Sequence, residues 1–339
     1  MKLIKTEDAV GHVLCHDMTQ IIKDQYKDAR FRKGHVVTEE DIPVLLSMGK
    51  EHLYVWEMTP GMVHENDAAE RLLALCGQEN MIRSGVKEGK IELKAACDGV
   101  FLVDSARLVA VNSQDEVMIA TRKGGMAVRE DDKLAGMRVI PLVIEEEKLR
   151  KAEQAAGDKP LLSLKPYVRK TACIVATGGE VKKGLIKDTF TPVVIDKLKT
   201  YGIETLEVVY SGDGVENVRD AVLAMREKKP DMILCTGGMS VDPDDNTPGG
   251  IKAAGANIIA YGAPVLPGAM FLLGYFDDGM PVMGLPGCVM YAGATVFDLV
   301  LPKIAADVPV TRADLAALGE GGLCLGCKPC HYPICPFGK

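Results

Sequence analysis

Residues 231–248 read Asp-Met-Ile-Leu-Cys-Thr-Gly-Gly-Met-Ser-Val-Asp-Pro-Asp-Asp-Asn-Thr-Pro. The apolar run at the start is typical of a short buried strand, and the glycine pair after it lets a ligand approach bare backbone N–H groups. Three carboxylates follow closely, on Asp242, Asp244 and Asp245. Because hard cations prefer carboxylate oxygens, the stretch predicts a site for a phosphorylated ligand with a divalent cation. Taken alone, it is equally compatible with an acidic surface turn.

The composition is that of an ordinary globular protein, long enough for two or three domains. The chain has 339 residues and a formal net charge of −7, which argues against a general nucleic-acid-binding surface. It has no run of about 18 apolar residues and no apolar signal-peptide core, so we expect a cytoplasmic protein without a membrane segment. Ten cysteines are present, six of them scattered singly, which fits a reducing compartment.

Changes in the sequence pattern predict four regions. They are an N-terminal α+β segment (1–60), a second α+β region with a linker (61–165), an α/β domain (166–310) and a cysteine-rich tail (311–339). In the first half, Thr38 is expected to cap a helix that ends at Gly49. Short apolar runs predict strands at 100–103, 108–111, 117–120 and 139–144. The proline-containing stretch 158–166 is expected to interrupt regular structure and to mark the main boundary.

Beyond residue 171 strands and helices alternate regularly. Strands are predicted at 172–176, 203–210 and 232–235, and a helix at 215–228. Another helix is expected to begin at Thr191-Pro192, with a capping hydroxyl and a proline in its first turn, and to end at Gly202. This alternation implies parallel βαβ units with both faces of the sheet covered. Such sheets bind ligands beyond the carboxyl ends of their strands.

Every glycine-rich motif of this region follows a predicted strand. The four motifs are Thr177-Gly-Gly-Glu180, Ser211-Gly-Asp-Gly214, Thr236-Gly-Gly-Met-Ser240 and Leu285-Pro-Gly-Cys288. A single glycine pair is often only a tight turn. Four motifs at one edge of a sheet instead predict one crevice lined by backbone amides and acids. Neither a Walker loop nor a Rossmann glycine loop follows these strands.

These motifs, together with Asp245-Asn-Thr-Pro248 and Pro267-Gly268, resemble the molybdopterin-binding domain shared by the MoeA and MogA enzymes of molybdenum cofactor biosynthesis. The resemblance covers residues from about 171 to 308, and a weaker one to the start of MoeA-type chains covers 8–14. It implies a mostly parallel three-layer α/β domain. It also implies molybdopterin as substrate or ligand, with Mg²⁺.

The resemblance assigns roles to individual residues. The phosphate and pterin of molybdopterin are expected near Thr177, Gly178, Gly179, Thr236, Gly237, Gly238, Ser240, Pro286 and Gly287. Three acids are expected to act in catalysis by holding Mg²⁺ or positioning the reacting oxyanion, namely Asp245, Glu180 and Asp213, with Asp245 foremost. Asp242 and Asp244 are either further metal ligands or solvated turn residues.

Two departures from the MoeA pattern put metal insertion in doubt. Ala269 stands where those chains usually have a lysine, so a cation suited to an oxyanion such as molybdate is missing. Cys288 and Val289 replace an Asn-Pro pair. Cys288 is either a soft ligand or, as we favour, a small core-like residue opening a helix over 289–305.

The C-terminal tail carries four cysteines, Cys324, Cys327, Cys330 and Cys335, at spacings of two, two and four residues. This run resembles a ferredoxin-type motif with one inserted residue, and it predicts an iron–sulfur cluster or Zn²⁺, with His331 as a possible substitute ligand. Bound metal would supply the folding energy of so short a segment. A disordered, redox-labile tail is the alternative.

The preferred hypothesis is a transferase acting on molybdopterin or its adenylate, with ATP and molybdate as further substrates. Other assembly proteins or a target molybdoenzyme are the expected partners, and a homo-oligomer is a reasonable default. A non-catalytic cofactor carrier or redox sensor that docks through its tail is the second hypothesis. A nucleotide-processing enzyme of the CinA type, whose first domain shares this fold, is the third.

Overall fold

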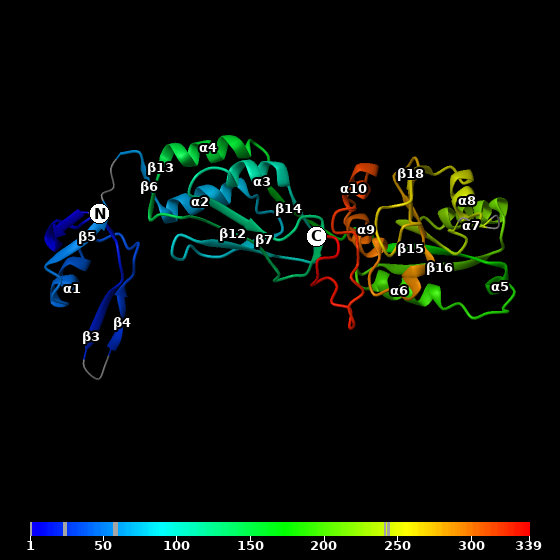
Figure 1. Ribbon diagram of the computed structural model, residues 1–339, viewed down its shortest axis with the longest axis horizontal. Helices are drawn as coiled ribbons and strands as arrows, with labels where there is room; N and C mark the ends of the chain where they lie inside the picture. The colour runs from blue at the N-terminus through cyan, green and yellow to red at the C-terminus, as the bar shows by residue number, and fades with distance from the viewer. Residues whose placement is uncertain (1, 23–25, 57–59, 241, 243–244) are drawn as a thin grey trace. The chain divides into compact units, whose positions relative to one another are not determined.

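The structure is a computed structural model that describes residues 2–22, 26–56, 60–240, 242 and 245–339. The chain forms two compact units, Met1–Leu164 and Lys165–Lys339. Figure 1 shows both units with their elements labelled. We describe each unit by itself.

The first unit begins with a small antiparallel sheet, in the order β1 (Lys2–Lys5), β5 (His52–Trp56) and β2 (Val13–Leu14). A hairpin of β3 (Met18–Ile22) and β4 (Tyr26–Phe31), a 3₁₀ turn η1 (Thr6–Asp8) and helix α1 (Asp41–Ser47) complete this part. Thr38 does not cap α1 as predicted. Its N–H and hydroxyl instead donate to the Asp41 carboxylate at 2.8 and 2.9 Å, so the acid is the acceptor.

Three further sheets fill the rest of this unit. The largest has the order β10 (Val117–Thr121), β12 (Lys133–Val139), β8 (Ile91–Ala95) and β7 (Met81–Arg83). The others are β11 (Met126–Val128), β9 (Gly99–Val103) and β14 (Leu162–Pro166), and the pair β13 (Val143–Glu145) and β6 (Met62–His64). Helices α2 (Glu65–Leu75), α3 (Ser105–Asn112) and α4 (Glu146–Ala156) accompany them, with one apolar core between.

Three predictions for this unit are wrong. The strand expected at 139–144 is divided between the end of β12 and the beginning of β13. Residues 108–111 lie in α3, because the Asp104 carboxylate accepts from the Arg107 N–H at 3.1 Å and caps a helix there. The stretch 158–166, expected to be irregular, contains strand β14. Pro166 ends this strand, a position at which proline is tolerated.

The second unit is built on a six-stranded sheet. Its order is β16 (Glu204–Ser211), β15 (Thr171–Thr177), β17 (Met232–Thr236), β20 (Pro281–Leu285), β19 (Leu272–Tyr275) and β18 (Asn257–Tyr261). The first four strands are parallel, and β19 is antiparallel to both of its neighbours. The predicted α/β fold with a mostly parallel sheet is therefore confirmed for this unit.

Helices cover both faces of this sheet, as Figure 1 shows. One apolar core contains residues of α6 (Phe190–Lys199) and α9 (Val296–Ala305), and the other contains residues of α7 (Val215–Glu227) and α8 (Thr247–Ala253). Shorter elements are α5 (Gly179–Lys182), η2 (Gly287–Met290) and α10 (Arg312–Ala317). The arrangement is a three-layer domain.

Two predicted helix starts are wrong. Helix α6 begins at Phe190, before Thr191-Pro192, because the Asp188 carboxylate accepts from the N–H groups of Phe190 and Thr191 at 2.9 and 3.0 Å. The helix expected over 289–305 begins only at Val296. Thr295 and Asp298 form a capping box there, so the preceding residues make the turn η2 and a loop instead.

The cysteine-rich tail packs on the second unit and runs beside α9 and α10 in Figure 1. Phe337 is only 2% exposed and belongs to the core that contains α6 and α9. The Tyr332 hydroxyl donates to the Asp298 carbonyl at 3.0 Å, and Leu323 forms a parallel bridge with Leu266. Apolar burial therefore contributes to the order of the tail.

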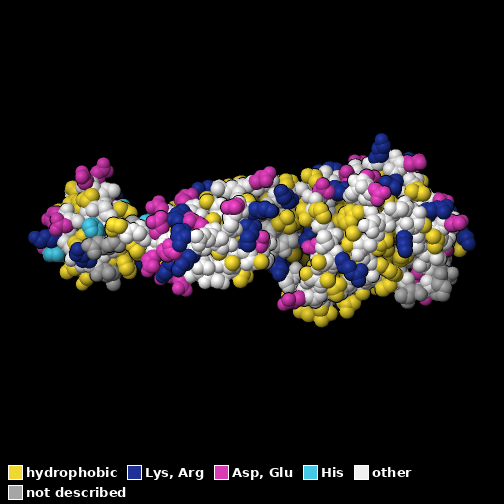
Figure 2. Space-filling model, turned by 90° about the horizontal axis from the view of Figure 1, so that it is seen from above, with side chains coloured by type: hydrophobic (Ala, Val, Ile, Leu, Met, Phe, Trp, Pro, Cys, Tyr) yellow, Lys and Arg dark blue, Asp and Glu magenta, His cyan; other side chains and the backbone are white. Residues whose placement is uncertain are grey.

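Basic and acidic side chains are intermixed over the face of the described residues that Figure 2 shows. Among the described helices, none combines the length and the apolar character needed to cross a bilayer.

Candidate functional site

Four of the predicted glycine motifs meet at one edge of the second unit's sheet. Strands β16, β15, β17 and β20 are parallel neighbours in that order, so their carboxyl ends lie side by side. The motifs that begin at Ser211, Thr177, Thr236 and Leu285 follow these strand ends directly. The topology thus brings together loops that are up to about 110 residues apart in sequence, as expected at the ligand-binding edge of such a sheet.

Three threonines join the two central loops. The Thr177 hydroxyl donates to the Thr236 carbonyl at 2.9 Å, and the Thr247 hydroxyl donates to the Gly237 carbonyl at 2.9 Å. The two hydroxyl oxygens lie 3.0 Å apart. Thr247 is 1% exposed, so these bonds are shielded from water. We call Thr177, Thr236 and Thr247 the threonine lock.

Gly237 fits against this lock only because it has no side chain. A Cβ there would stand 2.3 Å from the Thr177 carbonyl oxygen, and the backbone has φ of +80°. Gly238 is similarly close to Thr247. Both glycines therefore have a packing role in addition to any contact with a ligand.

Asp213 is already engaged within the fold. Its carboxylate accepts from the Gly179 N–H at 3.0 Å, and its carbonyl accepts from the Asn217 side-chain amide at 2.6 Å. The neighbouring Gly212 faces Lys182, whose Nζ would lie 3.9 Å from a Cβ at this glycine. A cation thus stands beside the loop 212–214, where the sequence patterns had indicated only acids.

Asp245 is half-buried, and its N–H donates to the Asp242 carbonyl at 2.9 Å. The hydroxyl of Tyr261, at the end of β18, donates to the Met239 carbonyl of the same loop at 2.9 Å. Desolvation, and secondarily the negative charge of Asp245, raise the pKa of the Tyr261 phenol, although the residue is 43% exposed. Tyr261 therefore supports the loop that carries Asp245 through its hydrogen bond to the Met239 carbonyl.

The structure says less about the surroundings of the other predicted acids. Asp242 is exposed at a bend, and Asp244 lies outside the described residues. Glu180 lies in α5, close in sequence to the loop edge. In the part of the chain that the structure describes, no three His, Cys, Asp or Glu side chains gather to hold a metal ion.

The fourth loop contains Pro286 and Gly287 and borders open space. Pro286 precedes η2, and a Cβ at Gly287 would meet no atom within 4 Å. Gly287 is therefore not required by packing, and its backbone stays approachable. Burial is the main cause that raises the pKa of the Cys288 thiol, which disfavours the thiolate that binds metals and fits the core-like interpretation.

Ala269 forms part of the backbone of a turn, since its carbonyl accepts from the Ala263 N–H at 2.9 Å. It lines a mostly apolar depression of about 410 Å³ together with Val265, Leu266 and Leu323. These neighbours offer no charge that replaces the expected lysine.

The four tail cysteines have unlike surroundings. Cys324 and Cys335 pack against the apolar core that contains α6 and α9, whereas Cys327 and Cys330 are exposed. Cys330 contacts Gly293, where a Cβ would lie 2.8 Å from its sulfur. A single metal centre would require these thiols to leave their present positions, so the described geometry does not fit one.

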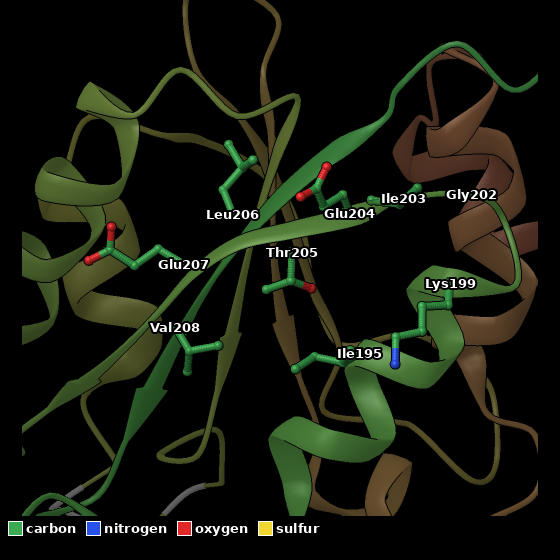
Figure 3. Close-up of a pocket in the computed structure, with 9 residues that line it drawn as sticks. All are labelled: Ile195, Lys199, Gly202, Ile203, Glu204, Thr205, Leu206, Glu207 and Val208. Atoms are coloured by element: carbon green, nitrogen blue, oxygen red, sulfur yellow. The ribbon is translucent and has the colours of Figure 1, made fainter.

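A separate groove of about 650 Å³ runs between β16 and α6 (Figure 3). Thr205 and Val208 point toward Ile195, while Leu206 points to the opposite side, because the pairing of β15 and β16 shifts register here. None of the predicted site residues lines this groove.

Comparison with protein families shows which family the domain around this sheet resembles. Residues 173–306 match a family described as "Probable molybdopterin binding domain". The second unit contains a domain of this family. Residues 3–57 match a domain family of unknown function. The match to the molybdopterin-binding domain includes all four glycine loops and supports a general role in molybdenum cofactor biosynthesis.

Several individual relatives are similar to one part of the chain. A CinA-like protein of Mycobacterium tuberculosis is 33% identical over 76 residues, which is 22% of this chain and 18% of that protein's length. Among solved structures, the CinA protein of Thermoplasma acidophilum has 18% identity and a TM-score of 0.35, covering 40% of this chain and 98% of its own. The Mog protein of Mycobacterium ulcerans has 20% identity and a TM-score of 0.35, covering 41% and 99%.

Three residues of the molybdopterin-binding domain were not among the predicted site residues. Thr247 completes the threonine lock, Tyr261 supports the loop of Asp245, and Lys182 faces Gly212. Thr247 lies within the quoted Asp245-Asn-Thr-Pro248 segment, which gave a signal for it. Tyr261 lies at the end of β18 and gave none.

Proposed function

We propose that the molybdopterin-binding domain holds molybdopterin, or its adenylate, across the four loops at the carboxyl edge of its sheet. The observation that carries this proposal is the convergence of four glycine motifs on adjacent strand ends within a domain of this family. Backbone N–H groups at such an edge suit a terminal phosphate. Because the Gly179 N–H is taken by Asp213, the phosphate draws on the loop 237–240 or displaces Asp213.

We further propose that Asp245 acts in a transfer reaction on the bound pterin. Asp245 is half-buried on the loop that the Tyr261 hydroxyl supports, whereas Asp213 is engaged in a structural hydrogen bond. Mg²⁺ usually reaches proteins through one or two carboxylates plus substrate phosphates. The separated acids fit that mode, with Asp245 and Glu180 as the protein ligands and the metal entering with its phosphate substrate. Lys182 supplies the cation that Ala269 lacks, directed at phosphate rather than at molybdate.

The experiment compares two acids of one loop. Asp245→Ala is expected to lower turnover of molybdopterin with MgATP, or of its adenylate with molybdate, by about 100-fold or more, with binding changed only a few-fold. Asp242→Ala is the matched control, because this acid is exposed on the same loop, and it is expected to stay within about threefold. Equal activities of the two variants would remove Asp245 from the reaction.

A carrier function is the second candidate, and the apolar surroundings of Ala269 favour it. A carrier retains a pterin through anaerobic purification, detected after oxidation by its fluorescence, but converts neither substrate pair. A CinA-type nucleotide activity is the third candidate, supported by the CinA-like relatives. Hydrolysis of a dinucleotide substrate in the absence of any pterin would favour that function over both others.

A metal in the tail remains a prediction, since the packed cysteines do not supply its ligands as they stand. Metal analysis of anaerobically purified protein tests it. Visible absorption with acid-labile sulfide would indicate an iron–sulfur cluster, and stoichiometric zinc in colourless protein would indicate a zinc site. Protein free of both, with the tail still resistant to proteolysis, would show that apolar packing alone holds the tail.

A further inference from the structure

Tyr291 is a large aromatic residue that the fold leaves in solvent next to one of the glycine loops. It directly follows η2, the turn that begins at Gly287, and it is 78% exposed. Its N–H donates to the Cys288 carbonyl at 3.2 Å, which holds the backbone in place while the ring remains in solvent. One exposed aromatic ring is ordinary on a protein surface, so its neighbours decide whether it has a role.

Met290, the residue before it, extends this surface toward the loop. Positions three apart lie on one face of a 3₁₀ helix, so Met290 stands on the same face of η2 as Gly287. Met290 is 39% exposed, and a Cβ at Gly287 would meet no atom within 4 Å. Open space therefore borders both an approachable backbone and a polarisable apolar side chain.

Tyr210 joins this surface from the end of β16. It is 42% exposed, and its hydroxyl donates to the Asp188 carboxylate at 3.2 Å. The next residue, Thr189, donates from its hydroxyl to the Met290 Sδ at 3.1 Å. Two successive residues in front of α6 thus hold Tyr210 and Met290 on one side of the four loops. We call Tyr210, Met290 and Tyr291 the apolar wall.

We propose that the apolar wall stacks on the planar heteroaromatic ring of a ligand whose phosphate lies on the glycine loops, with Tyr291 as the main contact. This inference rests on the proposed function and extends it, because it assigns residues to the ring rather than to the phosphate. The face of a tyrosine stacks well on a flat conjugated ring, and methionine sulfur packs against aromatic rings. Pterin and adenine both offer such a ring, and a binding comparison distinguishes them.

Calorimetric titration of the full chain tests the proposal, with a pterin monophosphate, AMP and inorganic phosphate as probes. Because stacking adds to phosphate binding, at least one of the two ring-bearing probes is expected to bind about tenfold or more tightly than phosphate. The tighter one identifies the ring. Affinities for both ring probes no higher than for phosphate would overturn the apolar wall while leaving the glycine loops as a phosphate site. No binding of any probe would overturn both the wall and the proposed function.

Variants of Tyr291 separate stacking from phosphate binding. Tyr291→Ala is expected to bind the preferred ring probe about tenfold more weakly and inorganic phosphate as tightly as before, since only the ring contact is lost. Retained phosphate binding also shows that the loops are still folded. Tyr291→Phe keeps the aromatic face and should retain the wild-type affinity. Tyr54→Ala is the matched control, because Tyr54 is 51% exposed on β5 of the first unit, and it should change nothing.

Two results with Tyr291→Ala would refute the role of the wall. One is an affinity for the ring probe equal to that of the wild type. The other is an altered oligomeric state in analytical ultracentrifugation together with that unchanged affinity, which would assign the wall to a contact between copies of the chain.

Discussion

The glycine loops and the cysteine tail are both dense runs of one residue type, yet the fold uses them differently. The glycine loops are far apart in sequence and are brought together by parallel strands, then joined by the threonine lock. The cysteines are close in sequence, but the tail places two of them against the core and two in solvent. Topology, rather than density in the sequence, therefore determines which of these residues lie together.

Apolar packing should order the tail. Loss of this packing should therefore lower the stability of the protein more than any other change considered below. Phe337→Ala is expected to lower the free energy of unfolding by about 3–5 kcal/mol, since this ring is 2% exposed in the main core. Ile334→Ala is the control, because Ile334 is 87% exposed in the same tail, and it should change stability by less than about 0.5 kcal/mol. Urea unfolding measures both. A small effect of Phe337→Ala would mean that the tail is not packed as described.

The glycine loops should be sensitive where packing requires glycine. Gly237→Ala is expected to cost about 3 kcal/mol, from the close contact with the Thr177 carbonyl and from a positive φ. Gly287→Ala lies in open space and should be near neutral for folding. If Gly287→Ala keeps its stability but weakens pterin binding, that loop contacts the ligand. Equal destabilisation by both substitutions would contradict the distinction between the two glycines.

The threonine lock should contribute less to the stability of the fold than these glycines do. Thr247→Val removes the hydroxyl that donates to the Gly237 carbonyl while keeping the side-chain shape, and about 1–3 kcal/mol of stability should be lost. Thr200→Val is a suitable comparison, because this exposed helical hydroxyl donates only to the Asp196 carbonyl of its own helix. Its removal should cost less than about 0.5 kcal/mol. Thermal unfolding of the two variants shows which of them has lost more stability.

The exposed tail cysteines should have the smallest effect on folding. Cys327→Ser and Cys330→Ser are expected to change stability by less than about 0.5 kcal/mol. Thiol labelling at pH 8 gives an independent check. Burial raises the pKa of Cys76 and Cys235 to about 12, so both should react only on unfolding, whereas Cys327 and Cys330 should react at once. Protection of Cys327 and Cys330 in native protein, lifted by a chelator, would restore the metal hypothesis.

Sequence patterns predicted the parallel strands of the second unit well because these strands are short apolar runs, three of which alternate with helices, whereas β18 and β19 were not predicted. Helix ends were predicted less well. Asp188 and the Thr295–Asp298 pair, rather than Thr191 and Val289, determine where α6 and α9 begin. Competing caps lie within a few residues of each other, and only the packed structure selects one.

Some candidate site residues could likewise be predicted from the sequence, and others could not. The glycine loops were visible as motifs, because each directly follows an apolar strand. Tyr261 and Lys182 were not, since their roles depend on which loop lies next to theirs in space.

The threonine lock also affects how much of the site must become ordered when a ligand binds. The Thr247 N–H donates to the Gly238 carbonyl at 3.2 Å, so helix α8 and the end of β17 are joined by backbone as well as side-chain bonds. Because this part of the site is already ordered, little binding free energy is spent on ordering it when a ligand binds. The amide of Thr247 should therefore exchange with deuterium slowly even without ligand, and binding should protect it little further.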